Sequence, residues 1–135
     1  MLVLGEMREL GDISKQEHQE LGNWLKDKAN YVVGVSGDSV YMTDYLIGLQ
    51  NPALQVNRLE TNIAAYEYIK DILNTHPEQK FFIVFKSSQG EIRLEEAIKP
   101  FILPAQWNNL PRQEQYWLSK KTFMKKIYIA EGEAK

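Results

Sequence analysis

Apolar and polar positions form two alternating kinds of segment along the chain. Runs of consecutive apolar residues predict buried strands at residues 1–5, 31–35 and 81–85, and an alternating pattern predicts a short strand around Leu54 and Val56. Apolar residues at helical spacing predict helices over residues 15–28 and 39–49, from residue 61 or 62 to 73, and over 94–101. This alternation is typical of a parallel sheet with right-handed crossovers. We therefore predict an α/β fold, a Rossmann-like three-layer sandwich with a mostly parallel sheet.

Two segments of the pattern bear on how the sheet is completed. Residues 81–85 are apolar on both faces, as expected for a central parallel strand. The first apolar run begins at Met1, and a buried strand rarely begins at a chain's first residue. We therefore expect the domain, residues 1–103, to be incomplete at its N-terminus.

A dense patch of charge follows the first predicted strand. The apolar run ends at Gly5, and Glu6, Arg8 and Glu9 come directly after it. Ligands of open α/β sheets bind outside the carboxyl ends of the strands, so this loop lies where a site is expected. The segment from Ser14 to Glu17 has the Ser-x-x-Glu form of a helix capping box.

A second polar loop follows the strand at residues 81–85. Lys86 could pair with a carboxylate or a phosphate as a point charge. Ser87, Ser88 and Gln89 offer hydroxyls, an amide and backbone N–H groups ahead of a helix, which makes a usable anion site. Because both loops leave the carboxyl ends of parallel strands, we expect one group of side chains to converge at a single sheet edge: Glu6, Arg8, Lys86 and Arg93.

Composition narrows the classes of function. A formal net charge of −2 gives no electrostatic argument for nucleic acid or for an acidic membrane. The chain has no cysteine, and His18 and His76 lack the spacing of metal ligands, so no metal site is expected. It has neither an apolar run of membrane-spanning length nor a signal peptide, so we expect a cytoplasmic domain with no membrane partner.

Two motifs in order resemble the C-terminal domain of the Mur ligases over residues 1–102. Gly5-Glu6-Met7-Arg8-Glu9-Leu10-Gly11, followed by His18 and Gly22, is similar to the Gly-Asp/Glu-Met-x-Glu-Leu-Gly segment of that domain. Residues 82–89, followed by Leu94-Glu95-Glu96, resemble its apolar strand, Lys-Gly-Ser-Arg/Gln loop and Leu-Glu helix start. Within the family, the resemblance is closest to the ligases that add D-alanyl-D-alanine to UDP-N-acetylmuramoyl-tripeptide.

The resemblance implies a role in peptidoglycan synthesis for the cell wall. The complete ligases use ATP and Mg²⁺ to convert a UDP-muramoyl-peptide carboxylate to an acyl phosphate, which the amine of D-alanyl-D-alanine attacks. Their C-terminal domain presents the dipeptide and closes over the ATP-binding central domain, the partner implied for this chain. On this resemblance the substrate-binding residues are Glu6, Arg8, Glu9, Lys86, Ser87, Ser88, Gln89 and Arg93.

Individual roles stay open at this point. Glu6 could bind the dipeptide's ammonium group or organise water and Mg²⁺. His18 could support the site as a proton carrier, or pack against its own loop as a structural residue. Ser87 stands where the family usually has glycine, which permits a positive φ or a close backbone approach, so the substitution raises the prospect of a degenerate site.

The sequence contains no Gly-x-x-x-x-Gly-Lys-Ser/Thr phosphate loop. We therefore expect no catalytic residue, no bound cofactor and no ligation by this chain alone. One alternative is a non-catalytic binding or interaction module that kept the fold, and another is an unrelated flavodoxin-like small-molecule binder. Residues 104–135 form an aromatic and basic tail, which we expect to be a docked helix because it carries many large apolar and lysine side chains: Trp107, Tyr116, Trp117, Phe123, Met124, Lys120, Lys121, Lys125, Lys126 and Lys135.

Overall fold

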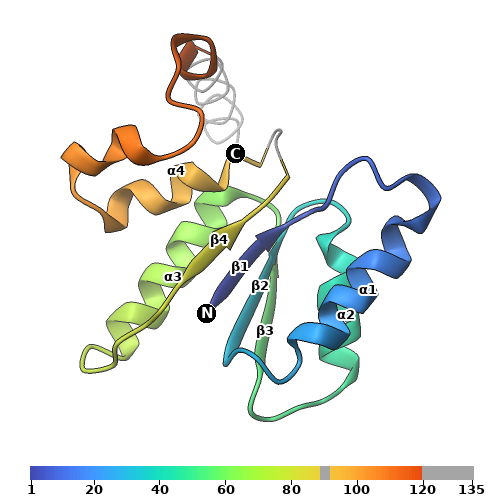
Figure 1. Cartoon of the computed structure of the whole chain (residues 1–135). Helices are drawn as coiled ribbons and strands as arrows, with labels where there is room; N and C mark the ends of the chain where they lie inside the picture. Colours follow the sequence, from blue (N-terminus) through green and yellow to red (C-terminus); the bar gives the residue numbers. More distant parts are fainter. Residues whose placement is uncertain (89–91, 120–135) are drawn as a thin grey trace, which may run out of the picture. The chain divides into compact units, whose positions relative to one another are not determined.

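The computed structural model describes residues 1–88 and 92–119. The chain forms two compact units, residues 1–98 and 99–135, each described here by itself. The first unit is built on a four-stranded sheet in which every neighbouring pair of strands is parallel, in the order β3-β2-β1-β4 (Figure 1). The predicted α/β class is confirmed.

The elements of the first unit follow the predicted order. Its strands are β1 (Leu2–Gly5), β2 (Tyr31–Val35), β3 (Gln55–Leu59) and β4 (Val84–Lys86). Its helices are α1 (Ser14–Leu25), α2 (Ser39–Gly48), α3 (Asn62–Thr75) and α4 (Leu94–Ile98), with a 3₁₀ turn at Gly11–Ile13. Because β1 pairs with both β2 and β4, the carboxyl ends of these three strands lie at one edge of the sheet.

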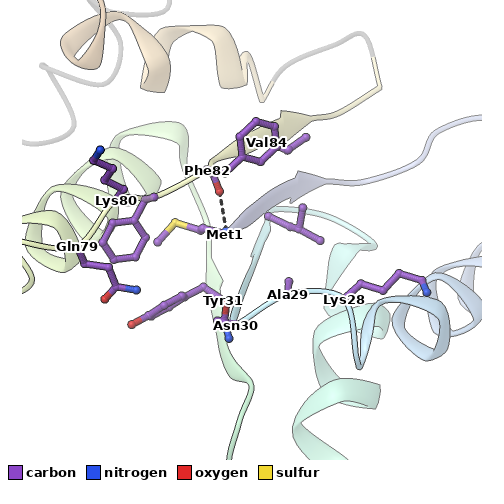
Figure 2. A pocket seen from close by; sticks show the side chains of 11 residues that line it. Met1, Lys28, Ala29, Asn30, Tyr31, Gln79, Lys80, Phe82 and Val84 are labelled. Carbon is purple, nitrogen blue, oxygen red and sulfur yellow. Dashed lines mark hydrogen bonds between the residues drawn. The ribbon is translucent and has the colours of Figure 1, made fainter.

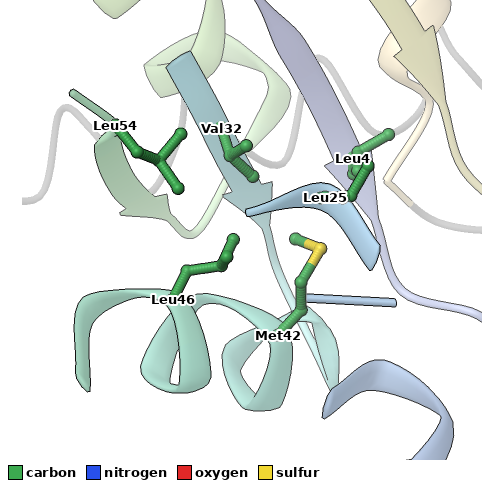
Figure 3. Packing of buried hydrophobic residues seen from close by; sticks show 6 residues of the cluster. All are labelled: Leu4, Leu25, Val32, Met42, Leu46 and Leu54. Atoms are coloured by element: carbon green, nitrogen blue, oxygen red, sulfur yellow. The ribbon is translucent and has the colours of Figure 1, made fainter. Parts of the chain in front are cut away.

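The helices cover both faces of the sheet, with α1 and α2 on one side and α3 and α4 on the other (Figure 1). The core under α1 and α2 consists of six buried apolar side chains, Leu4, Leu25, Val32, Met42, Leu46 and Leu54 (Figure 3). Each contributes roughly 1.5–3 kcal/mol by leaving water. This packing fixes β1 and β2, and it thereby fixes the loops that leave their carboxyl ends.

The prediction of a central strand at residues 81–85 is wrong. β4 is three residues long, begins at Val84, and pairs only with β1 among the described strands. Phe82 precedes the strand and its side chain is 83% exposed. The apolar run reflects a half-buried edge strand covered by α4 on one face, since an unbroken apolar run does not by itself distinguish central from edge positions.

The N-terminal ends of α1 and α3 are capped differently. At α3 the side chain of Thr61 accepts a hydrogen bond from the backbone N–H of Ala64 at 3.0 Å, as expected for an N-cap. At α1 the predicted capping box is wrong, because the N-cap residue is Ile13 and no side chain caps the helix. Ser14 is instead the first residue of α1, and its hydroxyl donates to Asp38.

The second unit contains 3₁₀ turns at Lys99–Phe101 and Pro104–Asn109 and a helical segment at residues 115–119. The indole N–H of Trp107 donates to the carbonyl of Lys99 at 3.2 Å, and the Lys99 ammonium lies 5.5 Å from the Trp107 ring centre. The lysines from Lys120 onward, Phe123 and Met124 lie outside the described residues, so the docked tail helix stays a prediction. No helix among residues 1–88 and 92–119 has the length and apolarity needed to cross a membrane.

Candidate functional site

The loops that follow β1 and β4 meet at the carboxyl edge of the sheet. The backbone N–H of Ser88 donates to the carbonyl of Glu6 at 3.2 Å. The backbone N–H of Arg8 donates to the Ser88 hydroxyl at 3.0 Å. Two segments 80 residues apart in the chain therefore form one surface, because their strands are neighbours in the same direction.

The carboxylate of Glu6 is held from two sides. Its Oε1 lies 2.6 Å from the Nε of Arg8, and its Oε2 accepts from the backbone N–H of Asp38 at 3.4 Å. The close approach requires Gly37, which has a φ of 52° and at which a Cβ would collide with the Glu6 carboxylate. The sequence placed residues 36–38 only between the strand at 31–35 and the helix at 39–49, so their role in holding Glu6 was missed.

His18 is a structural residue of the site. It is buried, and its Nε2 accepts a hydrogen bond from the backbone N–H of Met7 at 3.0 Å. Its Nδ1 lies 2.7 Å from the carbonyl oxygen of Ser14, which assigns the neutral ring with the proton on Nδ1. The two ring nitrogens tie the loop after β1 to the first turn of α1, which favours the structural interpretation over a proton carrier.

A further hydrogen bond ties the start of α1 to the residue that precedes α2. The hydroxyl of Ser14 donates to Oδ2 of Asp38 at 2.5 Å. Asp38 therefore uses its side chain toward α1 and its backbone N–H toward Glu6. It lay outside the residues singled out from the sequence, since neither its neighbours nor its spacing signals this contact.

Ser87 lies against Gly5, at a position where a Cβ on Gly5 would collide with the Ser87 side chain. The φ angle of Ser87 is not positive, so its backbone does not need the glycine that the family usually has there. Its hydroxyl donates to the carbonyl of Ser88 at 3.1 Å. The Ser87 side chain fits because the facing residue, Gly5, has no side chain, and the Ser87 backbone is not strained.

The other predicted site residues are placed differently. Lys86 is exposed and its ammonium donates to the carbonyl of Ser87 at 3.2 Å, so it bends over its own loop. Glu9 is exposed with a φ of 65°. Arg93 has a φ of 49°, and its carbonyl accepts from the side-chain amide of Asn62 at 3.2 Å. Gln89 lies outside the described residues.

The converging groups suit binding by charge and hydrogen bonds. Glu6, Arg8 and Ser88 offer a carboxylate, a guanidinium and a hydroxyl within one continuous surface. No group of three or more His, Cys, Asp or Glu side chains within residues 1–88 and 92–119 could hold a metal ion. Glu6 is a single carboxylate already paired with a guanidinium, so these residues do not by themselves fit Mg²⁺, and we derive no step through it.

A hollow of about 350 Å³ lies at the opposite, amino end of the strands (Figure 2). The Met1 ammonium donates to the carbonyl of Phe82 at 2.8 Å there, and burial lowers the pKa of that ammonium. Lys28 also lines the hollow, but its ammonium lies 4.8 Å from the Trp24 ring centre. The hollow is therefore separate from the surface around Glu6.

Comparisons with known proteins give a structural likeness only. No known family profile and no curated protein matches the chain. It is similar to crystal structure I of MurF from Acinetobacter baumannii, with 22% identity and a TM-score of 0.60 over 73% of this chain and 20% of that one. For crystal structure II of the same MurF the identity is 24% and the TM-score 0.62, over 73% and 21%. The chain spans about a fifth of the length of these structures, and with that part of MurF it shares its fold.

Proposed function

We propose that this chain is the C-terminal, dipeptide-presenting and cleft-closing portion of a cytoplasmic ligase that joins D-alanyl-D-alanine to UDP-N-acetylmuramoyl-tripeptide in peptidoglycan synthesis. The observation that carries the proposal is the convergence of Glu6 and Arg8 with Ser88 at the carboxyl edge of the sheet. The two motifs that resemble the Mur ligases supply these residues, and the fold shared with part of MurF supports the same assignment.

Arg8 is the residue best placed to receive the dipeptide. Its Nε is fixed by Glu6, and its side chain is 42% exposed. A guanidinium is a planar group of donors that matches a carboxylate, and D-alanyl-D-alanine carries one carboxylate and one ammonium group. We assign the dipeptide's carboxylate to Arg8, with Ser88 and Glu6 setting the position of that guanidinium and its loop.

The part played by this chain is positioning. In the complete enzyme ATP would supply a phosphoryl group to the carboxylate of the UDP-muramoyl-peptide, with ADP leaving, on the ATP-binding central domain that would be this chain's partner. Holding the dipeptide in a fixed orientation lowers the entropic cost of the attack by its amine. Substrate-binding roles for Glu9, Lys86, Ser87, Gln89 and Arg93 belong to the same proposal, and Arg8 is the residue that tests it most directly.

The test is a ¹⁵N NMR titration of the chain with D-alanyl-D-alanine at millimolar concentrations. We expect saturable shifts in the amides of Glu6, Arg8 and Ser88, and weaker shifts with L-alanyl-L-alanine. R8Q is expected to remove the response. R58Q is the matched control, because Arg58 pairs with Asp44 in another exposed ion pair, at 3.1 Å. Absence of shifts in the wild-type chain, or an equal loss with R58Q, overturns the proposal.

The alternative is a non-catalytic binding module that kept this fold. Ser87 raised that alternative, but its backbone conformation does not require glycine, so this substitution does not by itself favour the module over the ligase. A chain that ignores both dipeptides while remaining folded favours the module. A coding frame that continues upstream into a phosphate-loop domain favours the ligase.

A further inference from the structure

A closed circuit of hydrogen bonds runs beneath the Glu6–Arg8 pair and involves no residue of the loop after β4. It passes from the Met7 backbone N–H to His18, from His18 to the Ser14 carbonyl, and from the Ser14 hydroxyl to Asp38. The backbone N–H of Asp38 then returns to the Glu6 carboxylate, next to Met7 in the chain. The circuit joins the loop after β1 to the starts of α1 and α2.

We propose that Asp38, Ser14 and His18 are positioning residues that set the orientation of Glu6, and through it of Arg8, for ligand binding. The proposal rests on the proposed function only for the identity of the ligand. Its structural part is that the surface groups are oriented by α1 and α2 rather than by the loop itself.

The burial of the circuit supports this role. His18 is 1% exposed and Ser14 is 8% exposed, so their hydrogen bonds are protected from competition with water. The ring of Tyr41 packs edge-on against His18 with 6.5 Å between ring centres, and the Lys15 ammonium lies 5.9 Å from the Tyr41 ring centre. In contrast, Arg8 is half-exposed. An exposed surface group is therefore attached to a buried, hydrogen-bonded support.

Together with Arg8, the circuit engages both carboxylate oxygens of Glu6. A glutamate side chain in a loop samples several rotamers unless both carboxylate oxygens are engaged. Here Oε2 meets the Asp38 amide and Oε1 meets Arg8. Removing the Asp38 side chain frees the turn that carries this amide, because its bond to Ser14 is lost. Glu6 and Arg8 would then lose their common orientation while the core beneath them stays packed.

Two variants of His18 separate positioning from simple loss of packing. In H18Q the longer amide can still accept from the Met7 N–H, whereas in H18N the shorter amide can still donate to the Ser14 carbonyl but leaves Met7 without its acceptor. We expect H18N to speed hydrogen exchange of the Met7 amide and to weaken dipeptide binding about two- to tenfold, the effect of one hydrogen bond. H18Q is expected to keep the Met7 exchange rate and the dipeptide affinity closer to wild type. H18N and H18Q both change a buried side chain, so a difference between them reports the hydrogen bond to Met7 rather than the loss of packing.

A second pair of variants avoids the buried position. D38A is expected to speed exchange of the Met7 and Glu6 amides and weaken dipeptide binding, with partial rescue in D38N, whose amide oxygen still accepts from Ser14. D44A is the matched control, since Asp44 is an exposed acid of α2, the helix that Asp38 precedes, and it pairs with Arg58. Thermal unfolding of each variant reports whether the fold has been lost.

The dipeptide-binding measurement tests the proposed function, and the hydrogen-exchange measurement tests the circuit. If the wild-type chain does not bind the dipeptide, the proposed function fails, but the exchange rates still test the circuit. If D38A exchanges like D44A, or if H18N and H18Q are indistinguishable in exchange and binding, the circuit does not position the loop and this inference is wrong.

Discussion

Arg8 and Ser88 lie 80 residues apart in the chain, yet the backbone N–H of Arg8 donates to the Ser88 hydroxyl at 3.0 Å. S88A removes the hydroxyl acceptor and leaves in place the other hydrogen bond between the two loops, from the Ser88 backbone N–H to the Glu6 carbonyl. Because the Arg8 amide is exposed, water replaces the hydroxyl, and we expect a loss of about 1 kcal/mol or less in unfolding free energy.

The loop itself should respond more strongly than the global stability. We expect S88A to speed hydrogen exchange at Arg8 and to broaden the amide signals of the loop after β1. S87A is the control, because the Ser87 hydroxyl bonds within its own loop. Equal exchange at Arg8 in S88A and wild type would mean that the two loops are held together without this bond.

Gly5 and Ser87 share a space that holds only one side chain. An alanine Cβ at Gly5 would overlap the Ser87 side chain and would lie 3.0 Å from Cδ1 of Ile92. We expect G5A to lower the unfolding free energy by about 1–3 kcal/mol, as in overpacked cores, measured by urea denaturation.

Two further variants test the cause. G5A/S87G should recover part of the loss, because the second change restores the space. G48A is the control, since nothing lies within 4 Å of a Cβ there and Gly48 is the last residue of α2, so we expect no comparable loss. An unrecovered double variant would place the strain of G5A elsewhere than at Ser87.

Much of the fold follows from local pattern. The strand over residues 31–35 and the helices around it were predicted to within a few residues, because each has a clear hydrophobic period and a turn at its end. The position of β4 did not follow. Whether a strand lies at the edge or in the centre of a sheet depends on the order in which the strands pair. An apolar run such as residues 81–85 is compatible with either position.

The candidate site divides in the same way. Convergence of Glu6 with Ser88 follows from two loops leaving neighbouring parallel strands, which is a property of the topology. The contact of Glu6 with Asp38 does not, because it depends on a left-handed Gly37, at which a Cβ would collide with the Glu6 carboxylate. The bend of Lys86 over its own loop is likewise a rotamer choice that no spacing encodes.

Tyr68 makes the unfolding free energy of the first unit depend on pH in the alkaline range. Burial raises the pKa of its phenol above the ordinary value of 10.0, nearby Tyr31 raises it further, and a hydrogen bond with Asn57 partly offsets the shift. The folded chain therefore holds this proton more tightly than the unfolded chain does. The contribution is fully present below pH 10 and is lost as pH rises through the folded pKa.

The measurement is urea unfolding at a series of pH values from neutral to strongly alkaline. We expect the wild-type unfolding free energy to decline more steeply above pH 10 than that of Y68F, which has no phenol to titrate. Parallel curves for the two proteins would show that Tyr68 does not contribute to the alkaline loss.

The isolated chain is expected to show no ATP hydrolysis and no ligation above background. The sequence has no Gly-x-x-x-x-Gly-Lys-Ser/Thr loop to cradle a nucleotide's phosphates, and the Glu6 carboxylate is already paired with the Arg8 guanidinium. The assay is coupled phosphate release with ATP, Mg²⁺, UDP-muramoyl-tripeptide and D-alanyl-D-alanine, with product detection by mass spectrometry. R8Q run in parallel separates turnover by this chain from a contaminating enzyme. Activity that survives repurification and falls in R8Q would contradict the assignment of the chain as a non-catalytic portion, since a contaminant does not depend on Arg8.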